Sequence, residues 1–171
     1  MSIYSPSDDS YLILKYAKKY SKGKCLDMGS GSGIIANEML KFSKDVTSVD
    51  INPEVISYLS KNKKLKVIKS DLFSKVKDKF DCIFFNPPYL PTEEPKDLAL
   101  DGGKEGYEVI LRFLKDVKSY LKKEGVLILL ISSLSKQKVI DDYLIKNKFK
   151  FKQIDKLKLF FEELYIYEIR Y

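Results

Sequence analysis

Short apolar runs alternate with segments of helical periodicity along most of the chain. Five apolar runs have the length of buried strands, and they lie at 24–28, 45–50, 65–69, 80–85 and 125–132. The predicted helices lie at about 7–20, 33–42, from Asn52-Pro53 onward, 107–122 and 135–147. This alternation predicts an α/β fold with a mainly parallel sheet.

Two further strands are expected at the end of the chain, at about 149–157 and 163–171. No helical segment separates them, so they are expected to pair as an antiparallel hairpin. The result is a Rossmann-like, seven-stranded, mostly parallel sheet with one antiparallel strand near its edge and helices on both faces. The 171 residues suit a single domain, 1–171.

Composition narrows the class of protein. No apolar run reaches 18 residues and no signal-peptide pattern opens the chain, which favours a cytoplasmic protein without membrane spans. Cys25 and Cys82 lie in apolar runs and are expected to be buried, reduced thiols. The chain has no histidine, so neither an ordinary zinc site nor the commonest general base is available, and no metal site is predicted.

The net charge of +7 comes almost entirely from lysine, since only Arg112 and Arg170 are arginines. Scattered lysines are more typical of solvated faces than of a dedicated nucleic-acid surface, which the charge alone still permits.

A glycine-rich turn, Asp27-Met28-Gly29-Ser30-Gly31-Ser32-Gly33, follows the first predicted strand. Glycines allow the backbone to turn tightly beside a ligand at the carboxyl end of a strand. Ile34 stands where a dinucleotide fingerprint has its third glycine, which weakens a nicotinamide or flavin interpretation. Asp27 suits a cofactor with an ammonium group, and S-adenosylmethionine has one.

Three aspartates end successive strands. Asp50 can accept hydrogen bonds from ribose hydroxyls, and Asp71 with Leu72 can hold an adenine. Any one of them alone would more often be a turn or cap residue. Together with Gly29 and Gly31 they predict a site for S-adenosylmethionine.

Asn86-Pro87-Pro88-Tyr89 follows the fourth predicted strand. A double proline can simply end a strand. The Asn86 side-chain oxygen and the Pro87 carbonyl can instead each accept one N–H of a planar substrate nitrogen. Pro88 would stiffen the loop and Tyr89 would pack on the flat substrate group. The segment resembles the Asn-Pro-Pro-Tyr motif of methyltransferases that act on NH₂ groups, which makes these four residues the predicted catalytic residues.

Two more segments narrow the resemblance. Tyr4-Ser5-Pro6-Ser7-Asp8-Asp9-Ser10 is similar to the Y-x-P-x-[ED]-[ED]-[ST] segment of one branch of HemK-like methyltransferases. Asp101-Gly102-Gly103 with Gly106 is similar to the G-G-x-x-G element of that family. The branch comprises the archaeal and eukaryotic methyltransferases of class I peptide-release factors. Its bacterial relatives carry an additional N-terminal helical domain, for which this chain has no room.

The resemblance implies a substrate, a partner and site residues. The substrate would be the glutamine of a Gly-Gly-Gln loop in a release factor, methylated on N5. Asn86, Pro87 and Tyr89 would bind the acceptor. Cofactor contacts are implied for Ser10, Asp27, Gly29, Gly31, Asp50, Asp71, Leu72 and Asn86. Residues 1–20 would cover the cofactor site, and Ser10 is either a cofactor contact or an ordinary first-turn residue. A small zinc-binding activator would dock along an exposed sheet edge by strand addition.

Two other functions stay open at this point. The same four residues could hold an exocyclic base nitrogen of DNA or RNA, although no insertion that would present an unstacked base is evident. The chain could also be a catalytically silent scaffold that binds only the cofactor, which an intact Asn86-Pro87-Pro88-Tyr89 makes less favoured. Small-molecule acceptors are a minor third possibility.

Overall fold

The computed structural model describes residues 5–92 and 101–171 of the chain. Across these residues, seven strands form one sheet in the order β3-β2-β1-β4-β5-β7-β6. The strands are β1 (Lys24–Met28), β2 (Asp45–Asp50), β3 (Leu65–Lys69), β4 (Phe80–Phe85), β5 (Leu121–Ser132), β6 (Lys150–Lys158) and β7 (Glu163–Arg170). Only the pairs β5–β7 and β6–β7 are antiparallel, so β7 is the reversed strand and lies next to the edge. The predicted sheet is confirmed.

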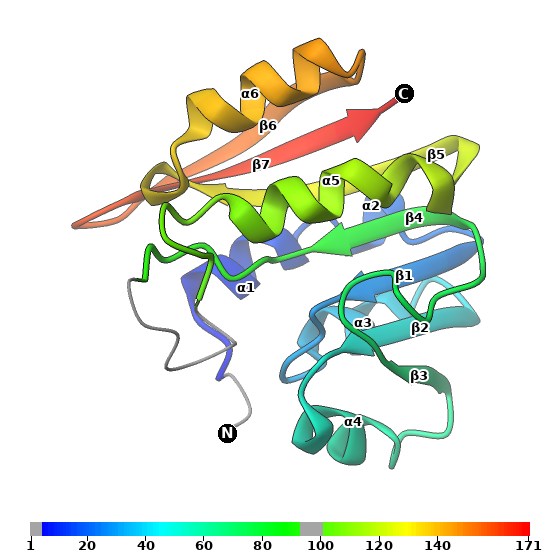
Figure 1. Cartoon of the computed structure of the whole chain (residues 1–171). Coiled ribbons are helices and arrows are strands. Elements are labelled where there is room, and N and C mark those ends of the chain that lie inside the picture. The colour runs from blue at the N-terminus through cyan, green and yellow to red at the C-terminus, as the bar shows by residue number, and fades with distance from the viewer. Residues whose placement is uncertain (1–4, 93–100) are drawn as a thin grey trace.

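Helices cover both faces of the sheet (Figure 1). They are α1 (Asp8–Leu14), α2 (Ala17–Tyr20), α3 (Ile34–Met39), α4 (Pro53–Leu59), α5 (Glu108–Tyr120) and α6 (Gln137–Lys146), with a short 3₁₀ turn, η1 (Ser133–Ser135). α1, α2 and α3 pack together on one face, whereas α5 and α6 pack on the other.

The period of two along the strands separates two apolar layers. In β5, Leu127, Leu129 and Ile131 belong to the layer under α5 and α6. Val126, Ile128 and Leu130 face the layer under α1 and α3. Alternate residues of a strand point to opposite faces, so a continuous apolar run is required where both faces are covered.

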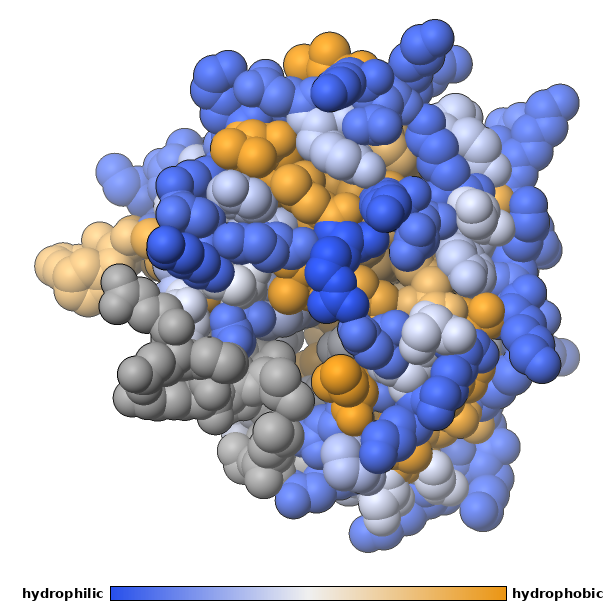
Figure 2. Space-filling model, viewed as in Figure 1, coloured by the Kyte–Doolittle hydropathy of each residue, from blue (hydrophilic) through white to orange (hydrophobic). Residues whose placement is uncertain are grey.

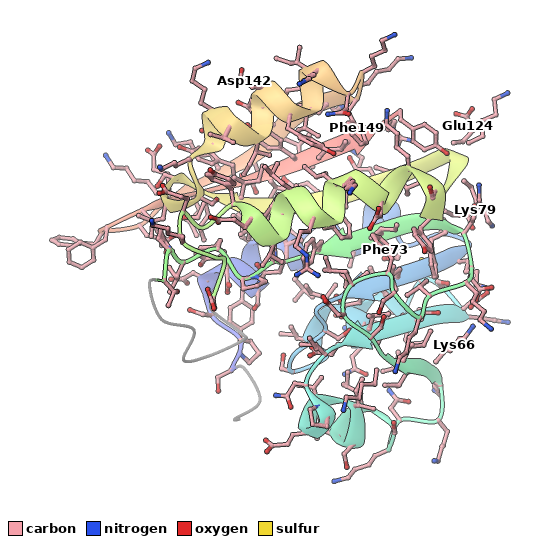
Figure 3. All side chains as sticks on the ribbon, viewed as in Figure 1. Lys66, Phe73, Lys79, Glu124, Asp142 and Phe149 are labelled. Carbon is pink, nitrogen blue, oxygen red and sulfur yellow. The ribbon has the colours of Figure 1, made fainter. Side chains whose placement is uncertain are left out.

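Aromatic side chains fill the layer under α5. Phe73 stacks on both Phe113 and Tyr120, with ring centroids 5.0 and 4.2 Å apart. Phe73 and Phe149, labelled in Figure 3, lie against this helical layer. The second layer contains both cysteines, which are buried free thiols as predicted.

The structure differs from the prediction at two places. The first predicted helix is interrupted, because the Tyr16 N–H bonds the Ile13 carbonyl three residues back and tightens the turn. β5 begins at Leu121 rather than at about residue 125, because Leu121 pairs with Phe80 across an irregularity in the register. Tyr4 lies outside the described residues. Among the residues described, no helix is long and apolar enough to cross a membrane.

Candidate active site

A pocket lies at the carboxyl edge of the parallel strands, between the glycine loop, the loop after β4 and the start of α1. Its wall contains nearly all the predicted site residues: Ser10, Gly29, Gly31, Asp50, Asp71, Leu72, Asn86, Pro87, Pro88 and Tyr89. Because parallel strands end at one edge, residues that are 79 positions apart, such as Ser10 and Tyr89, meet in one cavity.

The glycine loop is held to the neighbouring strand and needs its glycines. The N–H groups of Gly29 and Ser30 both donate to the Val49 carbonyl at the end of β2. Gly33, which precedes α3, has a φ of +75°, and a Cβ there would overlap the Leu59 side chain of α4. A larger residue at this position would therefore strain the left-handed backbone and displace the Leu59 side chain.

Asp50 fixes the loop from the side of β2. One carboxylate oxygen accepts the Gly31 N–H at 2.9 Å, and the other accepts the Asn52 N–H at 2.8 Å. Each oxygen retains further acceptor capacity. Asp50 can therefore hold the loop and still accept hydrogen bonds from a ribose.

Asp27 is the one predicted site residue that does not line the pocket. It is fully buried, and one oxygen accepts the Ala36 N–H of α3 at 3.1 Å. Its Oδ1 atom has no hydrogen-bond partner among the described residues. Burial raises the pKa of Asp27 to about 7; the nearby Ser30 hydroxyl and the bond from the Ala36 N–H oppose the rise, and the charge of Asp50 adds to it. Its contact with a cofactor stays a prediction.

Asp71 and Leu72 form the opposite wall. Leu72 has a φ of +46°, an uncommon conformation for a residue with a branched side chain. Asp71 is paired with Arg112 of α5 at 2.7 Å, and both side chains are about half exposed. Arg112 also lines the pocket, so a cation from α5 holds the carboxylate that was predicted to bind adenine.

Asn86 is oriented by a residue of the first helix, 77 positions earlier in the chain. Its Nδ2 donates to Oδ2 of Asp9 at 3.0 Å, and Asp9 is 5% exposed. A carboxylate can only accept, so this bond identifies the amide nitrogen and leaves Oδ1 on the other side. Oδ1 of Asn86 is buried and has no hydrogen-bond partner among the described residues. An unpaired buried acceptor is unfavourable unless a ligand satisfies it.

Gly102 and Gly106 pack directly on the backbone of Tyr89. A Cβ on Gly102 would lie 2.8 Å from the Tyr89 Cα, and one on Gly106 would lie 2.6 Å from the Tyr89 carbonyl oxygen. The Gly102 N–H also donates to the Leu90 carbonyl at 3.0 Å. The second glycine element therefore supports the loop that carries Asn86.

Comparison with known proteins agrees with this geometry. Residues 6–160 match the methyltransferase small domain family. The chain belongs to this family. A Methanocaldococcus jannaschii protein provisionally named protein N5-glutamine methyltransferase is 39% identical, over 96% of this chain and 89% of its own length. The release factor glutamine methyltransferase of Streptococcus pneumoniae is 34% identical over 58% of this chain, which spans 42% of that enzyme.

Solved structures similar to this methyltransferase include a chain of the E. cuniculi Mtq2–Trm112 complex, which methylates the translation termination factor eRF1. That chain superposes with a TM-score of 0.81 at 26% identity, and 99% of each chain is covered. The ribosomal protein L11 methylase of Lactobacillus delbrueckii, at 20% identity and a TM-score of 0.72, shares the fold. The resemblance to HemK-like methyltransferases is confirmed.

S-adenosylmethionine is the methyl donor of this methyltransferase. The residues that line the pocket fit it in three respects: a glycine loop, an acidic residue at the end of β2, and Asn86, whose buried amide oxygen has no partner among the described residues. The glycine loop and the acidic residue are features expected at a nucleoside site.

Sequence reasoning missed two residues of this methyltransferase. The motif at 4–10 predicts no separate role for Asp9, although Asp9 accepts a hydrogen bond from Asn86. The charge pattern predicts no site role for Arg112, although Arg112 pairs with Asp71 in the pocket. The acidic motif before the first helix was a signal for Asp9. For Arg112, no signal in the sequence separates it from the other basic residues.

Proposed function

We propose that this methyltransferase transfers a methyl group from S-adenosylmethionine to the side-chain amide nitrogen, N5, of the glutamine in the Gly-Gly-Gln loop of a class I peptide release factor. The observation that carries this proposal is the amide of Asn86, a residue that lines the pocket: its nitrogen donates to Asp9, and its buried oxygen has no partner among the described residues. The names and substrates of the relatives support it.

Binding of the acceptor depends on two oxygen atoms. The Oδ1 atom of Asn86 can accept one N–H of a primary amide, and the Pro87 carbonyl can accept the other. Pro87 is buried and Tyr89 is partly buried beside it. An amide nitrogen is a poor nucleophile, so fixing both of its N–H groups and favouring positive charge on it is the main contribution these residues can make.

Bound S-adenosylmethionine supplies an electrophilic methyl group on a sulfonium that leaves as a neutral thioether. Because the leaving group is neutral, this chain needs no general acid, which agrees with its lack of histidine. The acceptor nitrogen gains the methyl group and loses one proton to solvent. We assign the cofactor contacts to Ser10, Asp27, Gly29, Gly31, Asp50, Asp71, Leu72 and Asn86.

The N-terminal helices belong to the same proposal. Asp9 and Ser10 of α1 line the pocket and are nearly inaccessible to solvent. We therefore assign residues 1–20 as the segment that covers the cofactor site within a single domain, 1–171.

A small zinc-binding activator is proposed as the partner, with strand addition at the free edge of β3. The other free edge, β6, carries exposed Lys150, Lys152, Lys156 and Lys158, and such charges protect an edge against pairing. β3 exposes only two lysines, Lys66 and Lys69, and its Leu65, Val67 and Ile68 are half-buried. The association named in the Mtq2–Trm112 complex supports a partner of this kind. Strand addition predicts that the chain co-elutes with such a protein and that Val67→Pro, which disrupts the edge strand, abolishes the co-elution.

The test offers methyl-labelled S-adenosylmethionine to the protein with five acceptors: a release factor, the same factor with its Gly-Gly-Gln glutamine replaced, single-stranded DNA, RNA and duplex DNA. Label is expected only in the unmodified factor. Asn86→Ala is expected to slow transfer severely, to a residual rate that single-turnover assays can measure, with a much smaller effect on cofactor binding, whereas Asn37→Ala on the surface of α3 should change neither. Label in nucleic acid alone would replace the proposed acceptor with a base nitrogen, and unchanged transfer by Asn86→Ala would contradict the role of that residue.

A further inference from the structure

Two phenylalanines form the turn between β6 and β7. Phe160 and Phe161 are 92% and 87% exposed, and their rings meet edge to face with centroids 4.6 Å apart. This turn projects at the left of Figure 1, and Figure 2 shows hydrophobic surface at the same place, extending beyond the body of the molecule. Exposed aromatic pairs of this kind usually mark contact with another molecule.

The fold does not require aromatic residues here. The Leu159 N–H donates to the Glu162 carbonyl at 2.8 Å, so Phe160 and Phe161 are the two central residues of a tight hairpin turn. Glycine, asparagine and aspartate dominate such positions because they suit the backbone and water. Neither phenylalanine has a positive φ and neither is buried, so neither turn geometry nor core packing explains the pair.

The turn lies beyond the carboxyl ends of β4 and β5, which is the side of the sheet that holds the acceptor site. β7 runs antiparallel to β5, and its residue Leu164 pairs with Ser132, the last residue of β5. β4 runs parallel to β5, and Asn86 directly follows it. The hairpin therefore extends past the strand ends from which Asn86 projects. Near the opposite ends of β4 and β5, Figure 3 shows the charged side chains of Lys79 and Glu124 instead.

Polar contacts connect the turn to the catalytic loop. The Ser132 hydroxyl donates to Glu162 beside the phenylalanines. After η1, Lys136 forms an ion pair with Glu105. Glu105 lies within the 101–106 segment, which packs on Tyr89 through its glycines. A series of contacts thus connects the turn, which does not itself line the pocket, to the loop that carries Asn86.

We propose that Phe160 and Phe161 are a docking anchor for the body of the protein that presents the acceptor amide. This inference rests on the proposed function. A glutamine side chain is short, so a folded substrate that inserts it into the pocket must also rest on the surface around the pocket, and Phe160 and Phe161 are the most exposed large hydrophobic side chains among the described residues. Aromatic side chains are typical anchors of such interfaces.

The experiment compares Phe160→Ser/Phe161→Ser with Ile145→Ser. Ile145 is an apolar residue of α6, 65% exposed, at the end of the helix that points away from this edge (Figure 1). Both substitutions replace exposed apolar side chains, so neither should affect folding. Each protein is assayed on a full-length class I release factor and on a short peptide carrying its Gly-Gly-Gln loop.

For the double variant, KM for the full-length factor is expected to rise about tenfold or more, from lost burial of two aromatic rings, at unchanged kcat. Turnover of the peptide, cofactor Kd and all values for Ile145→Ser should stay the same. An unchanged KM, or a loss on the peptide as large as on the protein, would overturn the inference. The inference would also be overturned if the wild type were a dimer and the double variant a monomer with the same KM. Absence of wild-type turnover on both acceptors, with and without the zinc-binding activator, would instead reject the proposed function.

Discussion

The bond between Asp9 and Asn86 is the contact whose removal tests the catalytic interpretation most directly. Asp9 can only accept, so it fixes which end of the Asn86 amide is the nitrogen, and Oδ1 has no partner among the described residues. In Asp9→Asn, the new amide can offer either its oxygen or its nitrogen, so both orientations of Asn86 become possible. In Asp9→Ala, Nδ2 of Asn86 has no partner from this position at all.

The expected effect follows from the geometry. A hydrogen bond of 3.0 Å to a buried carboxylate contributes about 1.5–3 kcal/mol, and a neutral equivalent about half as much. If the loss falls on the transition state, the rate of methyl transfer drops about fivefold in Asp9→Asn and about thirtyfold in Asp9→Ala.

The assay is single-turnover transfer of labelled methyl at saturating cofactor and acceptor. Calorimetry gives the cofactor Kd separately, which is needed because Asp9 lines the pocket. The same two substitutions are then repeated in an Asn86→Ala background. There, Asp9→Ala should cost nothing further, since the residue it positions is gone.

A positioning role for Asp9 is refuted if the losses of transfer rate from the substitutions at positions 9 and 86 are simply additive in free energy. It is also refuted if cofactor saturation restores the rate of Asp9→Ala, because Asp9 would then act on the cofactor and not through Asn86.

Two further predictions concern glycine packing and a buried acid. Gly106→Ala places a Cβ 2.6 Å from the Tyr89 carbonyl at a φ of +82°, so the free energy of unfolding should fall by about 2 kcal/mol in chemical denaturation. An unchanged denaturation midpoint would show that the loop accommodates the added methyl group without loss of stability. For Asp27, the folded pKa of about 7 lies above its ordinary value of 3.8. The native state thus holds the proton longer, and this contribution to stability is complete below pH 3.8 and lost as pH rises through 7. Asp27→Asn should reduce the decline in unfolding free energy between pH 4 and 7 by on the order of 4 kcal/mol, and equal slopes for both proteins would contradict the shift.

The local sequence was sufficient to predict the helices and strands, and to predict that the site lies at the carboxyl ends of the parallel strands. Buried parallel strands are continuous apolar runs, and their carboxyl ends meet at one edge, so Asp50, Asp71 and Asn86 could be placed together without coordinates. Asn52 accepts the Glu54 N–H as an N-cap, and Pro53 opens α4, as local capping chemistry predicts.

Contacts between distant segments depended on how the helices pack over the sheet. The sequence contained Asp9 and Asn86, but nothing local shows that α1 brings them within 3.0 Å across 77 positions. The same holds for Arg112, which reaches Asp71 because α5 crosses the sheet at that point. Asp27 was correctly placed at the end of β1, yet its side chain points beneath the glycine loop to Ala36 and not into the pocket wall.

The sequence by itself therefore determined the secondary structure, the order of chemical groups along the sheet edge and the family, because these depend on short-range periodicity and motif spacing. Only the tertiary structure decided which groups are paired, buried or left without partners. Those properties depend on the summed packing of both helical layers against the sheet, which no single segment of the chain encodes.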